Sequence, residues 1–237
     1  MRHTSTNKTV TTRTNMRVAK TFLCVLFLLV AAATAAAQKP ERTPPSVPGL
    51  VEVVASEKLE GRVYINTVLG LRLPIPDGWS VSEDETKKQI IEAGKVAMKP
   101  SNEAQRAEME RSISNTAVLL TLMQSPPGQP VQSALIMMVE KLPAPRVTAT
   151  PYVMQLRTLL LENSTLKYSV DQDVHDETIN GQPFVALDVF VTGENVRVNQ
   201  KYACQMRKGF AFCLIETYGT DGQLAALKNV ADGITFK

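Results

Sequence analysis

Residues 179–218 decide the fold of this chain; their sequence is INGQPFVALDVFVTGENVRVNQKYACQMRKGFAFCLIETY. Asn180-Gly181 predicts a two-residue hairpin turn, because both central residues of a type I′ turn have positive φ, which Asn and Gly tolerate. Residues 184–191 follow, and nearly every one of them is apolar. A strand with two apolar faces needs cover on both. We therefore expect antiparallel strands joined by tight turns, with 184–191 as a central strand between two layers.

Two cysteines in this stretch predict a disulfide. Lys208-Gly209 is a second candidate turn, and Cys204 and Cys213 lie equally far from it on either side, so they face each other. They fall on a non-hydrogen-bonded pair, where Cα atoms lie ~4.5 Å apart, within the range that a disulfide spans. The alternative is two reduced, buried thiols that pack as small hydrophobic groups. A slip of the turn by one residue would place the two side chains on opposite faces.

The rest of the chain predicts further strands and helices, which together indicate an α+β domain. Hydrophobic residues make up 44% and charged residues 21% of the sequence, as in a globular rather than a disordered chain. Trp79 is expected to close one end of the core. Strands are expected at 62–66, 71–75, 117–123, 133–139 and 234–236, and helices from the capping box Ser82-x-x-Glu85 to Gly94, over 101–113, from the N-cap Thr150 to 162, and from Asp221 to Gly233.

The first 37 residues have the pattern of a signal peptide. Five basic residues and no acidic one lie within 2–20, an apolar run follows at 21–33, and Ala35-Ala36-Ala37 supplies the small residues that a signal peptidase accepts. The sequence predicts cleavage between Ala37 and Gln38 and an extracytoplasmic protein, either periplasmic or secreted. An uncleaved membrane anchor is the alternative, although the run is shorter than the ~20 residues that a span needs.

Removal of the signal changes the charge of the chain. Five of the 26 Lys and Arg residues and none of the 23 Asp and Glu residues lie in it, which leaves 21 basic against 23 acidic residues, a net charge of −2. A chain of this charge is not expected to bind nucleic acid. Contact with a membrane is expected only through the signal before cleavage. Translation can start at Met1 or Met16, because the segment from Met16 is itself a complete signal.

The mature chain is expected to hold one domain. Residues 38–60 begin with four prolines between Pro40 and Pro48, so they are interpreted as a Pro-rich linker and lead-in. Residues 61–237 then form a single globular α+β domain, with a polar helical insert near 82–114.

An acidic stretch, residues 171–177, is the candidate metal site. The possible ligands are Asp171, Asp173 and His175. The stretch departs from the calcium-binding hand, because its sixth position is Asp176 where the loop requires glycine. Extending the Asn180-Gly181 hairpin would pair Asp173 with Asp188, which is repulsive unless a cation lies between them or the pairing stops first. The second case, a solvated charged loop, is favoured.

No catalytic residue can be assigned from the sequence. His175 is the single histidine after the signal, and no serine lies in a Gly-x-Ser-x-Gly elbow, which weakens Ser-His-Asp and Cys-His schemes. The phosphate-binding and dinucleotide-binding glycine motifs and zinc-type Cys/His spacings are also missing from the sequence, so no cofactor is predicted. A pair of catalytic carboxylates stays open, because acidic residues are scattered along the chain.

The chain also carries a series of spaced structural marks. They are Tyr64-x-Asn66, Gly70-Leu71-x-Leu73-x-x-Pro76-x-x-Trp79, Gly181-x-x-Phe184, the paired strands around Cys204 and Cys213, and a closing helix and strand that end at Phe236. In this order they resemble the PsbP-like family, whose fold is that of the extrinsic subunit of photosystem II and occurs in exported bacterial proteins. The resemblance covers about residues 61–237, and the polar insert departs from it. It implies an antiparallel sheet with helices packed on both faces, an α/β/α sandwich. It transfers no functional residue, because members have different, mostly non-enzymatic functions.

The sequence leaves three hypotheses for function. The first is a non-catalytic exported domain that binds a partner protein or a small ligand. The alternatives are a carboxylate-dependent hydrolase and a divalent-cation-binding protein. A pocket lined by two or more convergent acids would favour the hydrolase, whereas a filled sheet with shallow grooves would favour the binding domain. Calorimetric titration with calcium, manganese and zinc tests the third hypothesis.

Overall fold

The computed structural model describes residues 48–97, 100, 102–124, 131–143, 147–193 and 196–237. The predicted signal peptide, its cleavage site and most of the Pro-rich segment lie outside these residues. Within them, none of the helices has the length and apolar character needed to cross a membrane.

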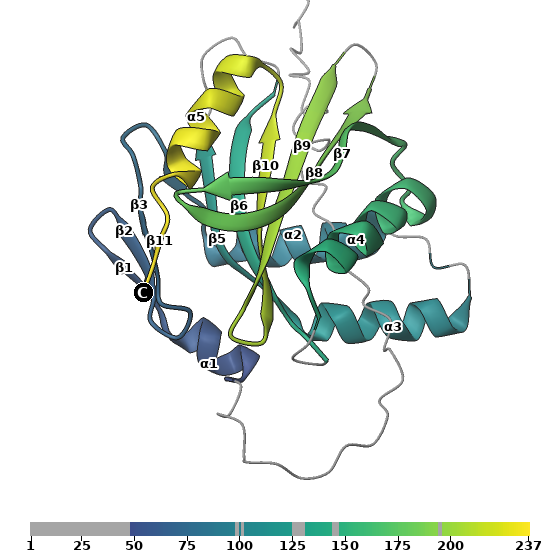
Figure 1. Cartoon of the computed structure of the whole chain (residues 1–237), viewed down its shortest axis with the longest axis horizontal. Helices are drawn as coiled ribbons and strands as arrows, with labels where there is room; N and C mark the ends of the chain where they lie inside the picture. Colours follow the sequence, from purple (N-terminus) through teal and green to yellow (C-terminus); the bar gives the residue numbers. More distant parts are fainter. Residues whose placement is uncertain (1–47, 98–99, 101, 125–130, 144–146, 194–195) are drawn as a thin grey trace, which may run out of the picture.

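Within the described residues, the largest element is an antiparallel sheet of seven strands (Figure 1). The stretch 179–218 supplies three of them. In spatial order the strands are β4 (Ser80–Val81), β5 (Thr116–Gln124), β6 (Ser133–Lys141), β10 (Phe210–Tyr218), β9 (Arg197–Arg207), β8 (Gln182–Thr192) and β7 (Tyr168–Ile179).

A smaller antiparallel sheet joins the two ends of the described chain. Its four strands are, in order, β1 (Glu57–Glu60), β2 (Val63–Asn66), β3 (Leu71–Pro74) and β11 (Thr235–Phe236). The helices described are α1 (Leu50–Ala55), α2 (Asp84–Ala97), α3 (Glu103–Ser114), α4 (Ala149–Asn163) and α5 (Asp221–Ala231). Because α1 and β1 precede Gly61, the domain includes part of the segment that was interpreted as its lead-in.

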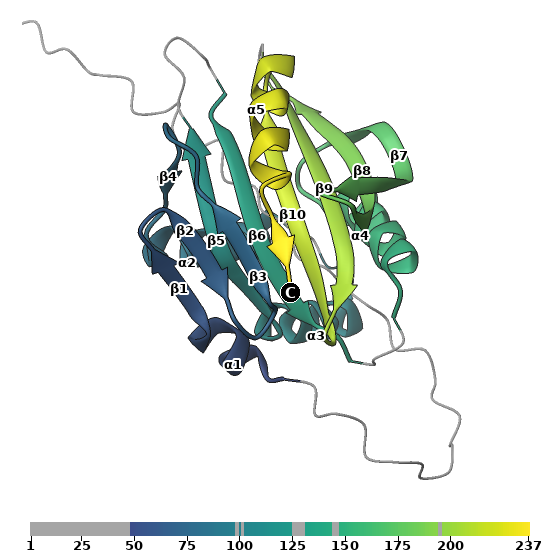
Figure 2. The same ribbon diagram turned by 60° about the vertical axis from the view of Figure 1, so that its left-hand side comes forward.

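The large sheet lies between two layers (Figure 2). On one face, the small sheet and α5 enclose a core that includes Leu73, Trp79, Phe212 and Leu227. On the other face, α2 and α4 cover a second core. The α+β class and the helices on both faces are thus confirmed. The small sheet and α5 cover the same face of the large sheet. The three-layer sandwich implied by the resemblance did not include this small sheet.

The two hairpins that organise the sheet have the predicted turns and register. Asn180 and Gly181 have φ of 44° and 72°, and Lys208 and Gly209 have φ of 49° and 83°. Positive φ at both central positions is the signature of the type I′ turn. Strand β8 is buried on both faces as predicted, but it lies next to the edge strand β7. The central strand is β10, every residue of which is buried.

Some helix ends differ from the predicted ones. The capping box at Ser82 does not form: α2 begins at Asp84, and the Ser82 hydroxyl donates to the sulfur of Met123. Helix α2 also continues through Gly94, which is buried inside it. The N-cap of α4 is Thr148 rather than Thr150. Differences of a few residues are usual at helix ends, which fray.

Gly70 leaves no room for a side chain. It has φ of 66°, and a Cβ placed on it would overlap the backbone oxygen of Lys237. Gly61 has a similar φ of 58° but open space around it, which makes it a matched control. We expect Gly70→Ala to lower the free energy of unfolding by about 2–3 kcal/mol and Gly61→Ala by about 1 kcal/mol. Urea unfolding of the two variants measures this difference, and equal losses would contradict the crowding.

Candidate functional site

Charged side chains gather on the large sheet beneath the end of α5. They line a pocket of about 110 Å³, which we call the acidic pocket. Its charged lining residues are Glu177 on β7, Lys201 on β9, Glu216 on β10, Lys228 on α5 and Asp232 at the end of α5.

The register of the sheet brings three of the charged groups together. Lys201 pairs with Asp188 on β8 and with Glu216 on β10. Directly opposed residues on neighbouring strands point to the same face, so the lysine lies between two acids. This row lies on the face that α5 covers, because Ala203 and Leu214, two residues along the same strands, belong to the core beneath α5.

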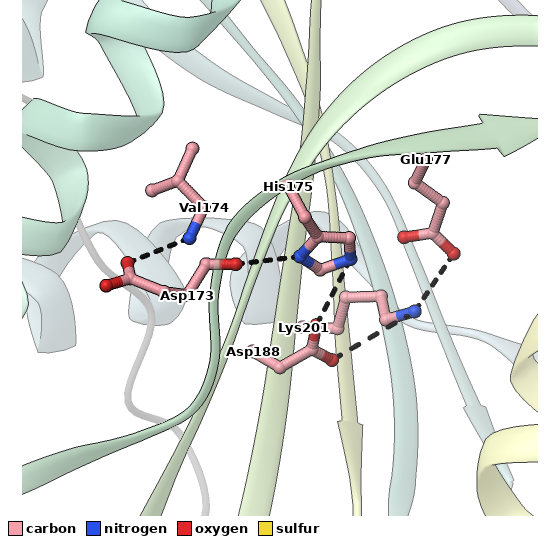
Figure 3. A network of polar contacts seen from close by, with 6 residues as sticks. All are labelled: Asp173, Val174, His175, Glu177, Asp188 and Lys201. Carbon is pink, nitrogen blue, oxygen red and sulfur yellow. Dashed lines mark hydrogen bonds and ion pairs between the residues drawn. The ribbon is translucent and has the colours of Figure 1, made fainter.

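Lys201 is the centre of the resulting network (Figure 3). Its Nζ donates to Oε1 of Glu177 at 2.9 Å and lies 4.0 Å from Oδ1 of Asp188. Burial alone would lower the pKa of Lys201, but the hydrogen bond that Lys201 donates to Glu177 and the charges of Asp188, Glu177 and Glu216 together raise it. The lysine is therefore held as a cation.

His175 approaches the same network from β7. Its Nδ1 lies 2.9 Å from the carbonyl oxygen of Asp173, and since a carbonyl only accepts, Nδ1 carries a proton. Its Nε2 lies 3.7 Å from Oδ2 of Asp188, an ion-pair contact too long for a hydrogen bond. Burial raises the pKa of Asp188, while Lys201 and His175 lower it in part.

Glu216 is the most isolated acid of the pocket. It is 4% exposed, and no hydrogen bond or ion pair joins its carboxyl group to another described residue. Burial raises the pKa of Glu216 to about 7, although the charge of Lys201 lowers it in part. Oε2 of Glu177 is likewise buried without a hydrogen-bond partner among the described residues. The pocket therefore holds carboxylate oxygens that lack donors.

The end of α5 adds negative potential to the pocket. The C-terminus of a helix carries a partial charge of roughly −0.5. Lys228 lies in the last turn and offsets this charge, whereas Asp232, the C-cap residue, adds to it. Three acids and two lysines line the pocket, so its electrostatics favour a cation.

A second buried acid lies on the opposite face of the sheet and is fully paired. Burial raises the pKa of Glu140 to about 7. Its two carboxylate oxygens accept hydrogen bonds from the hydroxyls of Ser112 at 2.7 Å and Tyr152 at 2.9 Å. These bonds connect α3 and α4 to β6, so the role of Glu140 is structural.

The three candidate metal ligands do not converge. Asp171 pairs with Arg197 and Asp173 with Arg157, each at 2.7 Å. Of these three side chains, only that of His175 reaches the network described above; Asp173 joins it through its backbone carbonyl oxygen. Among the described residues, no group of three or more His, Cys, Asp and Glu side chains is arranged to hold a metal ion.

The prediction of a solvated loop over residues 171–177 is wrong, because they belong to β7. A β-bulge changes the register between Gln172 and His175, so Asp188 faces Gln172 rather than Asp173. The bulge removes the expected repulsion between Asp173 and Asp188 without a cation or an end to the strand.

The sequence interpretation missed Glu177, Lys201, Glu216 and Asp232. A signal for two of them was present, because Lys201 and Glu216 lie equally far from the Lys208-Gly209 turn and are predicted to pair. An acid inside the otherwise apolar sequence Phe210–Tyr218 also indicates a buried charge. The positions of Glu177 and Asp232 depend on the bulge and on how α5 docks.

The two cysteines lie side by side at the middle of the sheet. Cys204 and Cys213 are directly opposed, with Cα atoms 4.2 Å apart, and a disulfide joins them. Both are buried in the core beneath α4, on the face opposite the acidic pocket. The disulfide therefore links the strands that carry Lys201 and Glu216 without entering the pocket.

The sequence matches no protein-family model and no curated protein. Similar solved structures include the cyanobacterial PsbP of Synechocystis sp., with 13% identity and a TM-score of 0.45 over 81% of this chain and 98% of that one. LpqN of Mycobacterium tuberculosis, described as involved in cell envelope biogenesis, has 15% identity and a TM-score of 0.40 over 70% and 83%. PA94 of Pseudomonas aeruginosa, a putative regulator of unknown function, has 16% identity and a TM-score of 0.33 over 44% and 69%. The first of these is a PsbP, the family that the sequence resembles.

Proposed function

We propose that the protein is a non-catalytic, exported domain that binds the ammonium group of a small ligand in the acidic pocket. The observation that carries this proposal is the presence in one pocket of two carboxyl groups with unused acceptors: Oε2 of Glu177 is buried without a partner, and the carboxyl group of the 4% exposed Glu216 accepts no hydrogen bond from a described residue. A buried polar group without a partner is unfavourable, and an ammonium group supplies up to three donors and a compensating charge.

The size of the pocket limits what it can bind. A volume of about 110 Å³ accommodates a group of a few heavy atoms, since one water molecule occupies roughly 30 Å³ of the liquid. An aminoalkyl group fits, and Leu224 and Ala231 in the lining provide contacts for its carbon atoms. The predicted signal peptide and the disulfide support the export part of the proposal.

The test is a titration with propylammonium, with the neutral 1-propanol as the control ligand. We expect saturable amide NMR shifts at Glu177, Lys201 and Glu216 with the cation alone. Binding should strengthen as the pH rises from 6 to 8, because Glu216, whose pKa is about 7, gains its charge over this range.

Two variants locate the binding. Glu216→Gln should weaken propylammonium binding about tenfold at pH 8 and remove the pH dependence, since a charge-assisted hydrogen bond is lost. Asp176→Asn should bind as the wild type does, because Asp176 precedes Glu177 on the same strand, is exposed and points to the other face. Equal shifts with 1-propanol, or unchanged binding by Glu216→Gln, would overturn the proposal.

A second candidate function is hydrolysis by paired carboxylates. The convergence of Glu177, Glu216 and Asp232 on one pocket favours it, with Glu216 as the acid because burial holds its pKa at about 7. Under the binding proposal, the wild-type protein releases no p-nitrophenol from p-nitrophenyl glycosides above the uncatalysed rate between pH 5 and 8. Release that disappears in Glu216→Gln but persists in Asp176→Asn would instead establish the hydrolase.

A further inference from the structure

A second pocket lies where the edges of the two sheets meet. Strand β1 is an edge strand of the small sheet and β4 an edge strand of the large one, and Figure 2 shows both on the same side of the molecule. Between them and the start of α2 is a pocket of about 430 Å³, which we call the inter-sheet pocket. Its volume is within the range of small-molecule sites.

Two polar groups in the lining have unmet hydrogen-bonding capacity. Tyr64 is 3% exposed, and its hydroxyl has no hydrogen-bond partner among the described residues. The side chain of Asn66 lies beside the Tyr64 hydroxyl and lowers the pKa of Tyr64 in part, but their geometry is not that of a hydrogen bond; the amide of Asn66 donates to the carbonyl oxygen of Val53 at 2.8 Å. Burial and the charge of Glu57 raise the pKa of Tyr64, so the hydroxyl keeps its proton and can donate.

Glu57 provides the complementary acceptor. Its Oε2 accepts a hydrogen bond from Nζ of Lys87 at 3.2 Å, whereas its Oε1 is buried without a partner among the described residues. Lys87 pairs with Asp84 at 3.1 Å as well as with Glu57, and Lys58 and Glu83 also line the pocket. With Lys87 beside Glu57, a neutral N–H or O–H group can donate to Oε1 without adding a third cation to the lining. Tyr64 and Glu57 together offer one donor and one acceptor to a bound molecule.

The rest of the lining has a polar part, formed by Lys58, Ser82, Glu83, Asp84 and Lys87, and an apolar part that is suited to a hydrocarbon chain. Leu119 and Leu120 are buried in the lining, and Leu59 and Val81, also in the lining, are 53% and 38% exposed. Exposed apolar side chains beside a pocket with a few polar groups are typical of a ligand site.

We propose that the inter-sheet pocket binds a neutral amphipathic molecule, a primary amide or alcohol with an aliphatic chain, whose polar head donates to Glu57 and accepts from Tyr64. This site shares no lining residue with the acidic pocket, and it does not depend on the function proposed there.

Octanamide and methyl octanoate are the matched probes, because the ester has a similar chain and an acceptor but no N–H donor. We expect octanamide to cause saturable methyl NMR shifts at Leu59, Leu119 and Leu120 of the full chain, and methyl octanoate to bind about tenfold more weakly. Failure of octanamide to give saturable shifts, or equal affinity for the ester, would overturn the proposal.

Three variants test the assigned contacts. Tyr64→Phe and Glu57→Gln should each weaken octanamide binding about tenfold. The first removes the hydroxyl donor, and in the second the single carbonyl oxygen of glutamine turns to Lys87, which leaves an NH2 group where Oε1 of Glu57 accepted. Glu60→Gln, on the same strand and exposed, should bind as the wild type does. If Tyr64→Phe and Glu57→Gln both retain wild-type affinity, the assignment of these two contacts is wrong. If either variant does not fold, the comparison of octanamide with methyl octanoate on the wild-type protein still tests the proposal.

Discussion

At pH 8, Glu216→Gln is expected to be about 3 kcal/mol more stable to unfolding than the wild-type chain. In the unfolded chain the glutamate has its ordinary pKa of 4.5, and burial raises the folded value to about 7. Between pH 4.5 and about 7, the folded state therefore binds a proton at Glu216 that the unfolded state has lost. The stability contributed by protonated Glu216 is therefore fully present below pH 4.5 and is lost as the pH rises through 7. A glutamine stays neutral at every pH in this range, so the variant does not lose this stability as the pH rises.

Urea unfolding between pH 4.5 and 8 measures this effect. The stability of the wild type should fall over this range, and the fall should be smaller in Glu216→Gln, while at pH 4.5 the two proteins should be nearly equally stable.

Glu140→Gln should act in the same direction but less strongly, because the hydroxyls of Ser112 and Tyr152 both donate to the carboxylate and one of them must turn to accept from the amide. The exposed variant Asp176→Asn should follow the wild type. A pH profile of Glu216→Gln parallel to that of the wild type would show that Glu216 ionises normally in the fold.

Loss of the disulfide is the second large effect. Cys204→Ala/Cys213→Ala is expected to lower the free energy of unfolding by about 2–3 kcal/mol, because the bridge closes a loop of roughly ten residues and restricts the unfolded chain. The loss should show in urea unfolding without reductant.

Reductant provides the control for the disulfide. Dithiothreitol should lower the urea midpoint of the wild type toward that of the double variant and leave the double variant unchanged. Intact mass of the protein purified from its host should show a chain that starts at Gln38 and lacks two hydrogens until it is reduced. A midpoint that is insensitive to reductant would mean that the bond does not contribute to stability, and a retained leader would contradict export.

Glu216 is expected to differ from the structural residue Glu140 in its effect on ligand binding. Replacement of Glu216 should stabilise the empty protein and weaken binding of the ammonium probe. A residue whose removal improves the fold but impairs binding is typical of a functional site, where stability is reduced in exchange for function. Glu140, with both oxygens paired, is not expected to affect ammonium binding.

The sequence was most informative where local geometry is decisive. Asn180-Gly181 and Lys208-Gly209 predicted their turns and the Cys204–Cys213 register correctly, because a type I′ turn fixes the pairing of the strands that follow it. The position of β8 beside an edge strand was missed, since an apolar run shows only that both faces are covered, not how many strands lie on each side.

The candidate site was less accessible to sequence reasoning than the fold. The bulge near Asp173 shifts the register by one residue, and no feature of that polar stretch indicates where the extra residue is placed. Asp232 reaches the pocket through the docking of α5, and Tyr64 reaches the inter-sheet pocket through contacts between two sheets. Such long-range placement depends on tertiary packing, which periodicity and motif spacing do not encode.

The pairing of β11 with β3 has a consequence for how the chain acquires its structure. Phe236 pairs with Leu71, and Arg207 and Lys208 donate to the carbonyl oxygens of Leu69 and Val68. A polypeptide that emerges N-terminus first therefore presents Leu71 and Leu73 long before their partners exist. Contacts of such high sequence separation form slowly and leave apolar surface open to aggregation. Strand β3 therefore lacks its β11 partner until residues 235–236 have been synthesised, which makes the small sheet a late step in folding.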